Sequence, residues 1–238
     1  MINIEFLGTW SALLIKGRKN VSFILNKKIL FETGPHTLQA MLDNNLDPLK
    51  IETVIISHMH LDHYSGLSEF LWYRTLMNSK DTFYIVGPKG IKNNTEKLLK
   101  NLYTPKSFEI RAEYYEDQNF DFISFYKGTH SIDNNGYRIE LKDFVIFYSG
   151  DTMRSENMVK GAEDADYLIH EMTFTDYLKK MAVLSKHSTY SDSIYVFEKS
   201  KAKYLISFHF TLDTENLTKI ISEKNNRILF PKNRLKIK

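Results

Sequence analysis

The sequence predicts an α/β sandwich, in which two mixed β-sheets pack together and helices cover their outer faces. Short apolar runs of strand length occur in both halves of the 238 residues, and segments with helical periodicity follow them. Several metal-capable side chains come directly after an apolar run, as expected where strand ends meet at one sheet edge. No repeat or linker-like tract interrupts the chain, so we expect a single domain spanning residues 1–238.

The expected elements alternate short strands with helices. In the first half, strands are expected at 2–7, 12–16, 21–26, 28–32, 52–57 and 83–86. Helices are expected there at 37–44, 66–77 and 91–102. The second half should hold strands at 121–126, 136–141, 144–148, 166–170 and 203–208, and a helix at 189–200. Lys142 and Asp143 fit the turn of a hairpin between two of these strands.

Composition narrows the class of protein. Hydrophobic residues make up 42% and charged residues 26% of the chain, which is ordinary for a soluble globular protein. The absence of cysteine excludes disulfides, thiolate metal ligands and a cysteine nucleophile. No apolar stretch reaches the length of a membrane span, and the first residues show no cleavable signal pattern. We therefore expect a cytoplasmic protein with no membrane partner.

The net charge of +3 is too small to predict nucleic-acid binding by itself. Basic side chains nevertheless cluster near both ends of the chain, at Lys16, Arg18, Lys19, Lys232, Arg234, Lys236 and Lys238. Such clusters could neutralise phosphates, or they could be solvated lysines on a loop and at the chain end.

The densest chemical signal is the run His58-Met59-His60-Leu61-Asp62-His63, which packs four metal-binding side chains into six residues. It follows the apolar stretch 52–57, so it should form the loop at the end of a buried strand. Alternate residues of an extended segment point the same way, which lets His58 and His60 bind one ion. Asp62 and His63 come as the chain turns, and can face a second ion. Imidazole and carboxylate ligands without thiolate suit zinc, manganese or iron.

Further polar residues follow other apolar runs. They are His130, Asp151, Glu171 with His170 before it, and His209. One such residue alone is usually a core or turn residue. Their recurrence, together with the run at 58–63, favours a shared active-site edge.

These motifs resemble the metallo-β-lactamase superfamily, and within it the ribonuclease Z branch, which matures tRNA 3′ ends. The run at 58–63 is similar to the superfamily's H-x-H-x-D-H motif. His170-Glu171-Met172-Thr173 and His187-Ser188-Thr189 are similar to the His-Glu-Ala-Thr and His-Ser-Thr boxes of ribonuclease Z. The resemblance implies the αββα sandwich of the metallo-β-lactamase fold, a hydrolase that cleaves phosphodiesters in pre-tRNA, and a homodimer.

The resemblance also implies two divalent metal ions, with Zn²⁺ favoured and Mn²⁺ or Fe²⁺ as alternatives. One ion would take His58, His60 and His130, and the other Asp62, His63 and His209, with Asp151 bridging the pair. Two such ions can hold a hydroxide between them and offset the charge of an in-line displacement at phosphorus. Asp62 would then accept a hydrogen bond from that nucleophile.

In the same way, the resemblance makes His187 the proton donor to the leaving 3′ oxygen. Glu171 would orient the His187 imidazole and raise its pKa, because a nearby anion favours the charged form. His170 is expected to be structural. His36, which belongs to no motif, is expected at the rim of the site.

Three features depart from ribonuclease Z. Only twenty residues lie between His130 and Asp151, enough for one hairpin, where the family usually carries a lysine-rich arm that grips tRNA. Glu32 stands where an aspartate usually supports the metal loop. Phe210-Thr211-Leu212-Asp213 follows His209, where the family usually has an arginine.

These departures leave two alternatives open. A small-molecule hydrolase, such as a cyclic-phosphate or cyclic-nucleotide phosphodiesterase or an arylsulfatase, needs no arm. The segment from Arg18 to Ser22 and both histidine boxes favour pre-tRNA as the substrate instead. A non-catalytic metal-binding module would be expected to have lost a ligand or the proton donor, and none is missing.

Overall fold

The computed structural model describes residues 2–231, except for the side chains of residues 219 and 222. The basic cluster formed by Lys232, Arg234, Lys236 and Lys238 lies outside the described residues. None of the described helices is long and apolar enough to cross a membrane.

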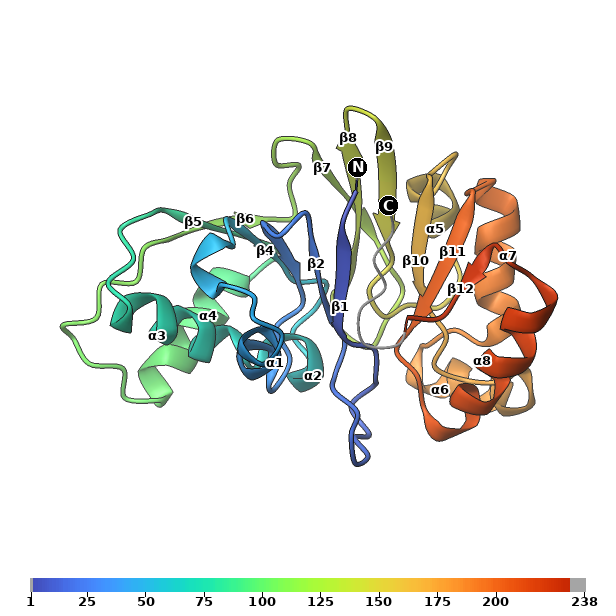
Figure 1. Cartoon of the computed structure of the whole chain (residues 1–238), viewed down its shortest axis with the longest axis horizontal. Helices are drawn as coiled ribbons and strands as arrows, with labels where there is room; N and C mark the ends of the chain where they lie inside the picture. Colours follow the sequence, from blue (N-terminus) through green and yellow to red (C-terminus); the bar gives the residue numbers. More distant parts are fainter. Residues whose placement is uncertain (1, 232–238) are drawn as a thin grey trace.

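Two mixed sheets, each of six strands, form the centre of the described chain (Figure 1). The first sheet holds, in spatial order, β1 (Ile4–Gly8), β2 (Ser22–Leu25), β3 (Ile29–Phe31), β4 (Thr53–Ile55), β5 (Phe83–Gly87) and β6 (Ala112–Glu116). The second holds β7 (Ile123–Lys127), β8 (Asn135–Leu141), β9 (Phe144–Tyr148), β10 (Tyr167–Glu171), β11 (Tyr204–Phe208) and β12 (Ile228–Leu229). Strands next to each other in the chain are therefore also neighbours in space.

Helices lie on the outer side of each sheet and connect its parallel strands, because a parallel pair needs a crossover connection (Figure 1). Those of the first sheet are α1 (Thr37–Asp43), η1 (Pro48–Lys50), α2 (Leu61–Tyr64), α3 (Leu67–Leu76) and α4 (Ile91–Asn101). Those of the second are α5 (Glu156–Gly161), η2 (Asp176–Leu178), α6 (Lys179–Ser185), α7 (Tyr190–Ser200) and α8 (Leu212–Lys224).

The inner faces of the two sheets share one hydrophobic core. The ring of Tyr148 on β9 lies 5.3 Å from that of Phe23, 5.5 Å from Phe31 and 5.2 Å from Phe208, measured between centroids. Separate apolar clusters join the first sheet to α1, α3 and α4, and the second sheet to α5, α7 and α8. The layers are therefore helix, sheet, sheet and helix, and the αββα sandwich expected from the sequence is confirmed.

The strand expected at 12–16 is wrong. β1 pairs directly with β2, so no place in the sheet is left for this segment. It forms a loop instead, and Leu13 is 64% exposed. The loop is fastened to the second sheet, because Trp10 forms a β-bridge with Phe210 and the Ser11 amide donates to the Phe210 carbonyl.

Several elements have too weak a pattern to be predicted from the sequence. They are β6, β12, α5, α6 and α8. β6 is only half buried, β12 has two residues, and α6 buries Ala182 alone among its side chains. An edge strand or an exposed helix lacks the hydrophobic periodicity on which prediction rests.

Candidate metal centre

The loop after β4 carries the four side chains of the run at 58–63. His58 and His60 lie on the extended stretch before α2, and Asp62 and His63 lie in its first turn. His58 Nε2 is 2.9 Å from His60 Nδ1, and His63 Nε2 is 3.4 Å from Asp62 Oδ2. The two residues of each pair therefore face one another, as the sequence spacing predicts.

This loop is pressed against the segment that follows β3. The Thr33 amide donates to the His63 carbonyl at 2.7 Å, and the Gly66 amide donates to the Thr33 carbonyl at 2.7 Å. A Cβ atom on Gly34 would lie 2.0 Å from the Asp62 carbonyl oxygen. Only glycine fits at position 34, so backbone packing fixes where the metal loop lies.

The second sheet supplies three further side chains from three different strand ends. His130 follows β7, Asp151 follows β9 and His209 follows β11. His130 Nε2 lies 3.1 Å from the Nδ1 atom of His60. Asp151 Oδ2 lies 3.2 Å from the Nε2 atom of His63, and His209 Nε2 lies 3.1 Å from Asp151 Oδ2. Side chains from both sheets thus meet at one edge of the sandwich.

The seven residues form two groups joined by one carboxylate. One group is His58, His60 and His130, and the other is Asp62, His63 and His209; within each group the possible ligand atoms lie within 4.8 Å of one another. Asp151 Oδ2 is 3.7 Å from His58 Nε2 and 3.2 Å from His63 Nε2. The structure therefore brings together every residue that the sequence analysis expects at the two metal ions, with Asp151 between the groups.

Each of the five histidines turns one ring nitrogen towards the cluster and the other towards an outer partner. The outer contacts are His58 Nδ1 with Ser57 Oγ (2.9 Å), His60 Nε2 with Ser131 Oγ (3.4 Å), His63 Nδ1 with Glu32 Oε2 (3.6 Å), His130 Nδ1 with the Lys186 carbonyl (3.0 Å) and His209 Nδ1 with Thr173 Oγ1 (2.8 Å). Histidines that bind metal typically have such a partner, because it fixes the tautomer and the orientation of the ring.

Unpaired buried atoms also fit a cation at this place. The Nε2 atom of His63 and the Oδ1 atom of Asp151 are buried in the cluster without a hydrogen-bond partner, which is costly unless another group satisfies them. Burial and the neighbouring imidazoles hold the pKa of His58 well below its usual value, against the opposing effect of Asp151. The neutral imidazole is the form that binds metal, so His58 in this state can donate to a divalent cation.

Glu32 supports the metal loop despite being one methylene longer than the aspartate usual in the family. It is fully buried with a positive φ of 59°. Its Oε1 atom accepts hydrogen bonds from the Ser57 amide at 3.0 Å and the Tyr148 hydroxyl at 2.8 Å, and its Oε2 atom faces His63. The carboxylate therefore reaches the loop just before His58. Nothing in the sequence marks Tyr148 as a partner of Glu32, because a tyrosine in an apolar strand is an ordinary core residue.

Glu171 and His187 form a pair beside the cluster. The buried Glu171 carboxylate accepts hydrogen bonds from the Thr152 amide (2.6 Å), the Ser188 amide (3.1 Å) and the Thr173 hydroxyl (2.5 Å), and lies 3.0 Å from His187 Nδ1. Burial lowers the pKa of His187, but the charge and hydrogen bond of Glu171 outweigh it and raise the pKa to about 9. The imidazolium is therefore held by Nδ1, and the His187 side chain remains 14% exposed.

The two other histidines lie outside the cluster. His170 is fully buried, and its Nδ1 atom donates to the Glu171 carbonyl at 2.9 Å, which fits the structural role expected of it. His36 is exposed at the N-terminus of α1, with a φ of 66°.

Basic side chains near the start of the chain are partly neutralised. Arg18 forms an ion pair with Glu215, and Lys19 lies 3.2 Å from Asp43. A short hairpin of β8 and β9 fills the interval between His130 and Asp151, so the arm of ribonuclease Z has no counterpart there.

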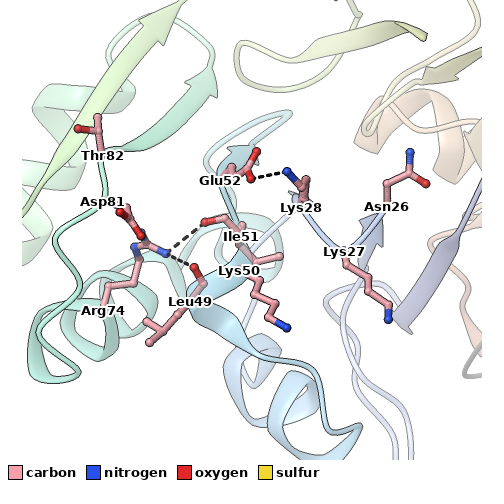
Figure 2. A pocket seen from close by; sticks show the side chains of 10 residues that line it. All are labelled: Asn26, Lys27, Lys28, Leu49, Lys50, Ile51, Glu52, Arg74, Asp81 and Thr82. Carbon is pink, nitrogen blue, oxygen red and sulfur yellow. Dashed lines mark hydrogen bonds and ion pairs between the residues drawn. The ribbon is translucent and has the colours of Figure 1, made fainter. Parts of the chain in front are cut away.

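A separate hollow of about 520 Å³ lies before the start of β4 (Figure 2). It is lined by Asn26, Lys27, Lys28, Leu49, Lys50, Ile51, Glu52, Arg74, Asp81 and Thr82. Lys28 pairs with Glu52 at 2.6 Å, and the Arg74 guanidinium donates to the Leu49 and Ile51 carbonyls. The hollow contains none of the expected site residues, and the run at 58–63 follows β4 at its other end.

The layered sheets and the histidine–aspartate cluster at their edge define a metal-dependent hydrolase. The family model of the beta-lactamase superfamily domain matches residues 27–210, and the chain therefore belongs to that superfamily. Ribonuclease Z of Sulfurisphaera tokodaii is 28% identical over 261 aligned positions, which cover 88% of this chain and 87% of the relative. Ribonuclease Z of Nanoarchaeum equitans is 26% identical over 260 positions, covering 87% and 82%. Both alignments are longer than this chain of 238 residues, so these relatives carry residues that it lacks.

Solved structures share the fold. The short form of human tRNase Z superposes with a TM-score of 0.84 at 22% identity, covering 99% of this chain and 98% of the human one. A diphosphatase of the PhnP family superposes with a TM-score of 0.77 at 18% identity, covering 100% and 98%. At this level of identity the likeness establishes the metallo-β-lactamase fold expected from the sequence.

Proposed function

We propose that the protein is a ribonuclease Z-like endoribonuclease that cleaves the 3′ extension from pre-tRNA. The observation that carries the proposal is the Glu171–His187 pair placed beside the seven-residue cluster. Its residues come from the two boxes that resemble ribonuclease Z, and the curated relatives named Ribonuclease Z match along most of the chain.

The cluster is proposed to hold two divalent cations, with Zn²⁺ as the native metal. His58, His60 and His130 would bind one, Asp62, His63 and His209 the other, and Asp151 both. Cations held there would supply an activated water at neutral pH and would offset the negative charge of the phosphate. Asp62 would accept a hydrogen bond from that water. Burial raises the pKa of Asp62, but His209 and His63 lower it below its usual value, which keeps the carboxylate ionised.

His187 is proposed to protonate the leaving 3′ oxygen. Glu171 holds the Nδ1–H of His187, so Nε2 is the nitrogen that can face the substrate. Three hydrogen bonds from Thr152, Thr173 and Ser188 fix the Glu171 carboxylate and leave it no freedom to turn away. A donor fixed in this way gives up its proton without reorganisation when the phosphodiester bond breaks.

Three further proposals concern the extent of the domain, the place of action and the oligomeric state. One domain over residues 1–238 is supported by the core shared between both sheets. A cytoplasmic site of action matches a pre-tRNA substrate. For a homodimer, the support is the exposure of apolar side chains on or beside α1, α3 and α4, where Leu42, Leu76, Met77 and Leu102 are 41–66% exposed.

A small phosphodiester is the second candidate substrate. The short β8–β9 hairpin favours it, because it leaves no arm to hold a rigid tRNA. The likeness in fold to a diphosphatase of the PhnP family agrees with this candidate but establishes no activity.

The deciding experiment is cleavage of a 3′-extended pre-tRNA by zinc- or manganese-loaded protein, with the cut site mapped and a small aryl phosphodiester assayed in parallel. A single cut just after the discriminator nucleotide supports tRNA maturation. Rapid turnover of the diester with intact pre-tRNA overturns it in favour of the second candidate. The Lys180→Met variant, changed on the exposed helix α6, serves as the control for both substrates.

A further inference from the structure

Lys186 lies between α6 and the proton donor His187, in a backbone conformation that disfavours lysine. Its φ is 56° and its ψ is 49°, in the left-handed region that usually falls to glycine at a helix C-terminus. A side chain kept at such a position is strained, and strain of this kind is tolerated where surrounding contacts compensate for it.

The Lys186 amide donates to the Val183 carbonyl within α6, and both contacts that Lys186 makes outside this helix go to one residue of the cluster. The Lys186 carbonyl accepts the Nδ1–H of His130 at 3.0 Å. The Lys186 ammonium donates in return to the backbone carbonyl of His130 at 3.3 Å. Two segments that are 56 residues apart in the chain are therefore clamped together by both the backbone and the side chain of one lysine.

The clamp determines which nitrogen of His130 faces the cluster. With Nδ1 protonated and bonded to Lys186, the unprotonated Nε2 points at His60 Nδ1, 3.1 Å away. The ring of His130 also meets the ring of His187 edge to face, at 4.8 Å between centroids. Lys186 thus lies against the ring that contacts both the first-sheet histidines and the proton donor.

The Lys186 ammonium has no acidic partner among the described residues. Other basic side chains, such as Arg18, Lys19 and Arg154, are paired with Glu215, Asp43 and Asp192. A full positive charge beside a cation site repels the cation, so the charge of Lys186 gives no reason for tighter metal binding. Its hydrogen bond to His130 does.

We propose that Lys186 is a positioning residue, which holds His130 and His187 in their relative places across the metal centre. Its carbonyl sets the tautomer of His130, and its ammonium fastens the loop that carries His130 to the end of α6. The inference rests on the proposed function for the reaction that is measured, but the clamp itself is a contact between residues of this chain.

Lys186→Met keeps the carbonyl and the length of the side chain but removes the ammonium. We expect zinc binding, measured by competition with a chelating dye, to weaken about 10-fold, as for other residues that orient a ligand. The kcat for a small aryl phosphodiester should fall by about 10-fold, with KM changed by less than about 2-fold. Lys186→Arg, which keeps a cationic donor, should recover most of both losses.

Lys186→Gly separates positioning from stability. Glycine relieves the strained φ, so the melting midpoint of the metal-free protein should rise while zinc affinity and kcat fall. Lys201→Gly is the matched control, because Lys201 ends α7 with a φ of 58°. It should raise the midpoint and leave zinc affinity and kcat unchanged.

Two results would overturn the inference. The first is a Lys186→Met variant that binds zinc as tightly as the unchanged protein or more tightly, which is what removal of a repelling charge alone produces. The second is a Lys186→Gly variant that keeps full kcat. Neither of these two results depends on the RNA substrate. Failure of the unchanged protein to cut pre-tRNA contradicts the proposed function. Zinc affinity and diester turnover of the variants test the role of Lys186.

Discussion

Strands β1–β6 and β7–β12 follow the same plan. In each half the first two pairings are antiparallel and the next three are parallel. Helices occupy corresponding crossovers in the two halves. The first crossover holds α1 or α5, the second holds the pair α2 and α3 or the pair α6 and α7, and the third holds α4 or α8. This topological repetition has no counterpart as a repeat in the sequence.

The two halves differ in how they carry the site. The first half places four side chains on one loop after β4, within six residues. The second half distributes His130, Asp151, Glu171 and His209 over the ends of four strands. A strand end offers one or two outward positions, so the second half can reach the cluster only from several strands at once. One half therefore supplies a local motif, and the other half supplies the separate side chains that complete the cluster around it.

The largest effect is expected where the two halves share one group. Asp151→Ala removes the carboxylate between His58, His63 and His209, and leaves their buried imidazoles without it. We expect loss of bound metal and a fall in turnover of about 1000-fold, or about 4 kcal/mol of transition-state stabilisation. Metal content by mass spectrometry and kcat are measured. Asp143→Ala, in the exposed turn between β8 and β9, is the control. An Asp151→Ala variant with the same metal content as this control would contradict the prediction.

His187→Ala tests the part of the second half that is not proposed to bind metal. Turnover should fall about 100-fold or more, because a positioned proton donor contributes at least that much. Metal content should be unchanged. Metal lost together with activity would instead make His187 a ligand. The test can distinguish the two roles because His187 Nδ1 lies only 3.9 Å from Asp151 Oδ2.

Gly34→Ala tests the first half without altering any side chain of the cluster. The new methyl group would meet the Asp62 carbonyl at 2.0 Å and push the metal loop away from β3. We expect zinc affinity to fall about 10- to 100-fold and the free energy of unfolding to fall by about 1–3 kcal/mol. Gly17→Ala is the converse control, because it has open space around it but a φ of +80°. Gly17→Ala should lower the free energy of unfolding and leave zinc affinity unchanged. A loss of zinc affinity in Gly17→Ala would show that the zinc-binding assay reports stability and not the position of the metal loop.

The smallest effect concerns one of the hydrogen bonds that join the halves through the core. Tyr148→Phe removes the hydroxyl that donates to Glu32, and should lower the free energy of unfolding by about 1 kcal/mol and zinc affinity by a few-fold. Tyr137→Phe removes a hydroxyl that donates to the Ile56 carbonyl in the same core. It should cost similar stability with no change in zinc affinity. Equal zinc affinities in the two variants would mean that Glu32 needs no support from the second sheet.

Much of the fold was predictable because apolar runs and helical periodicity are local signals. The strands around the hairpin of Lys142 and Asp143 lie within about one residue of their expected places. The segment 12–16 shows the limit, since an apolar run becomes a strand only where a neighbouring strand is free to pair with it. The exposed α6 shows the opposite limit, because a helix with only Ala182 buried has no pattern to detect.

The sequence by itself determined the donor set and its chemistry, because imidazole and carboxylate groups keep their metal-binding properties wherever they are placed, and because four of them lie within six residues. The tertiary structure decided what depends on distant parts of the chain. It put His130 beside His60 across 70 residues, let the longer Glu32 reach Ser57, and clamped His130 with Lys186. Such contacts arise only when two sheets pack together, since no local spacing encodes which atoms then meet.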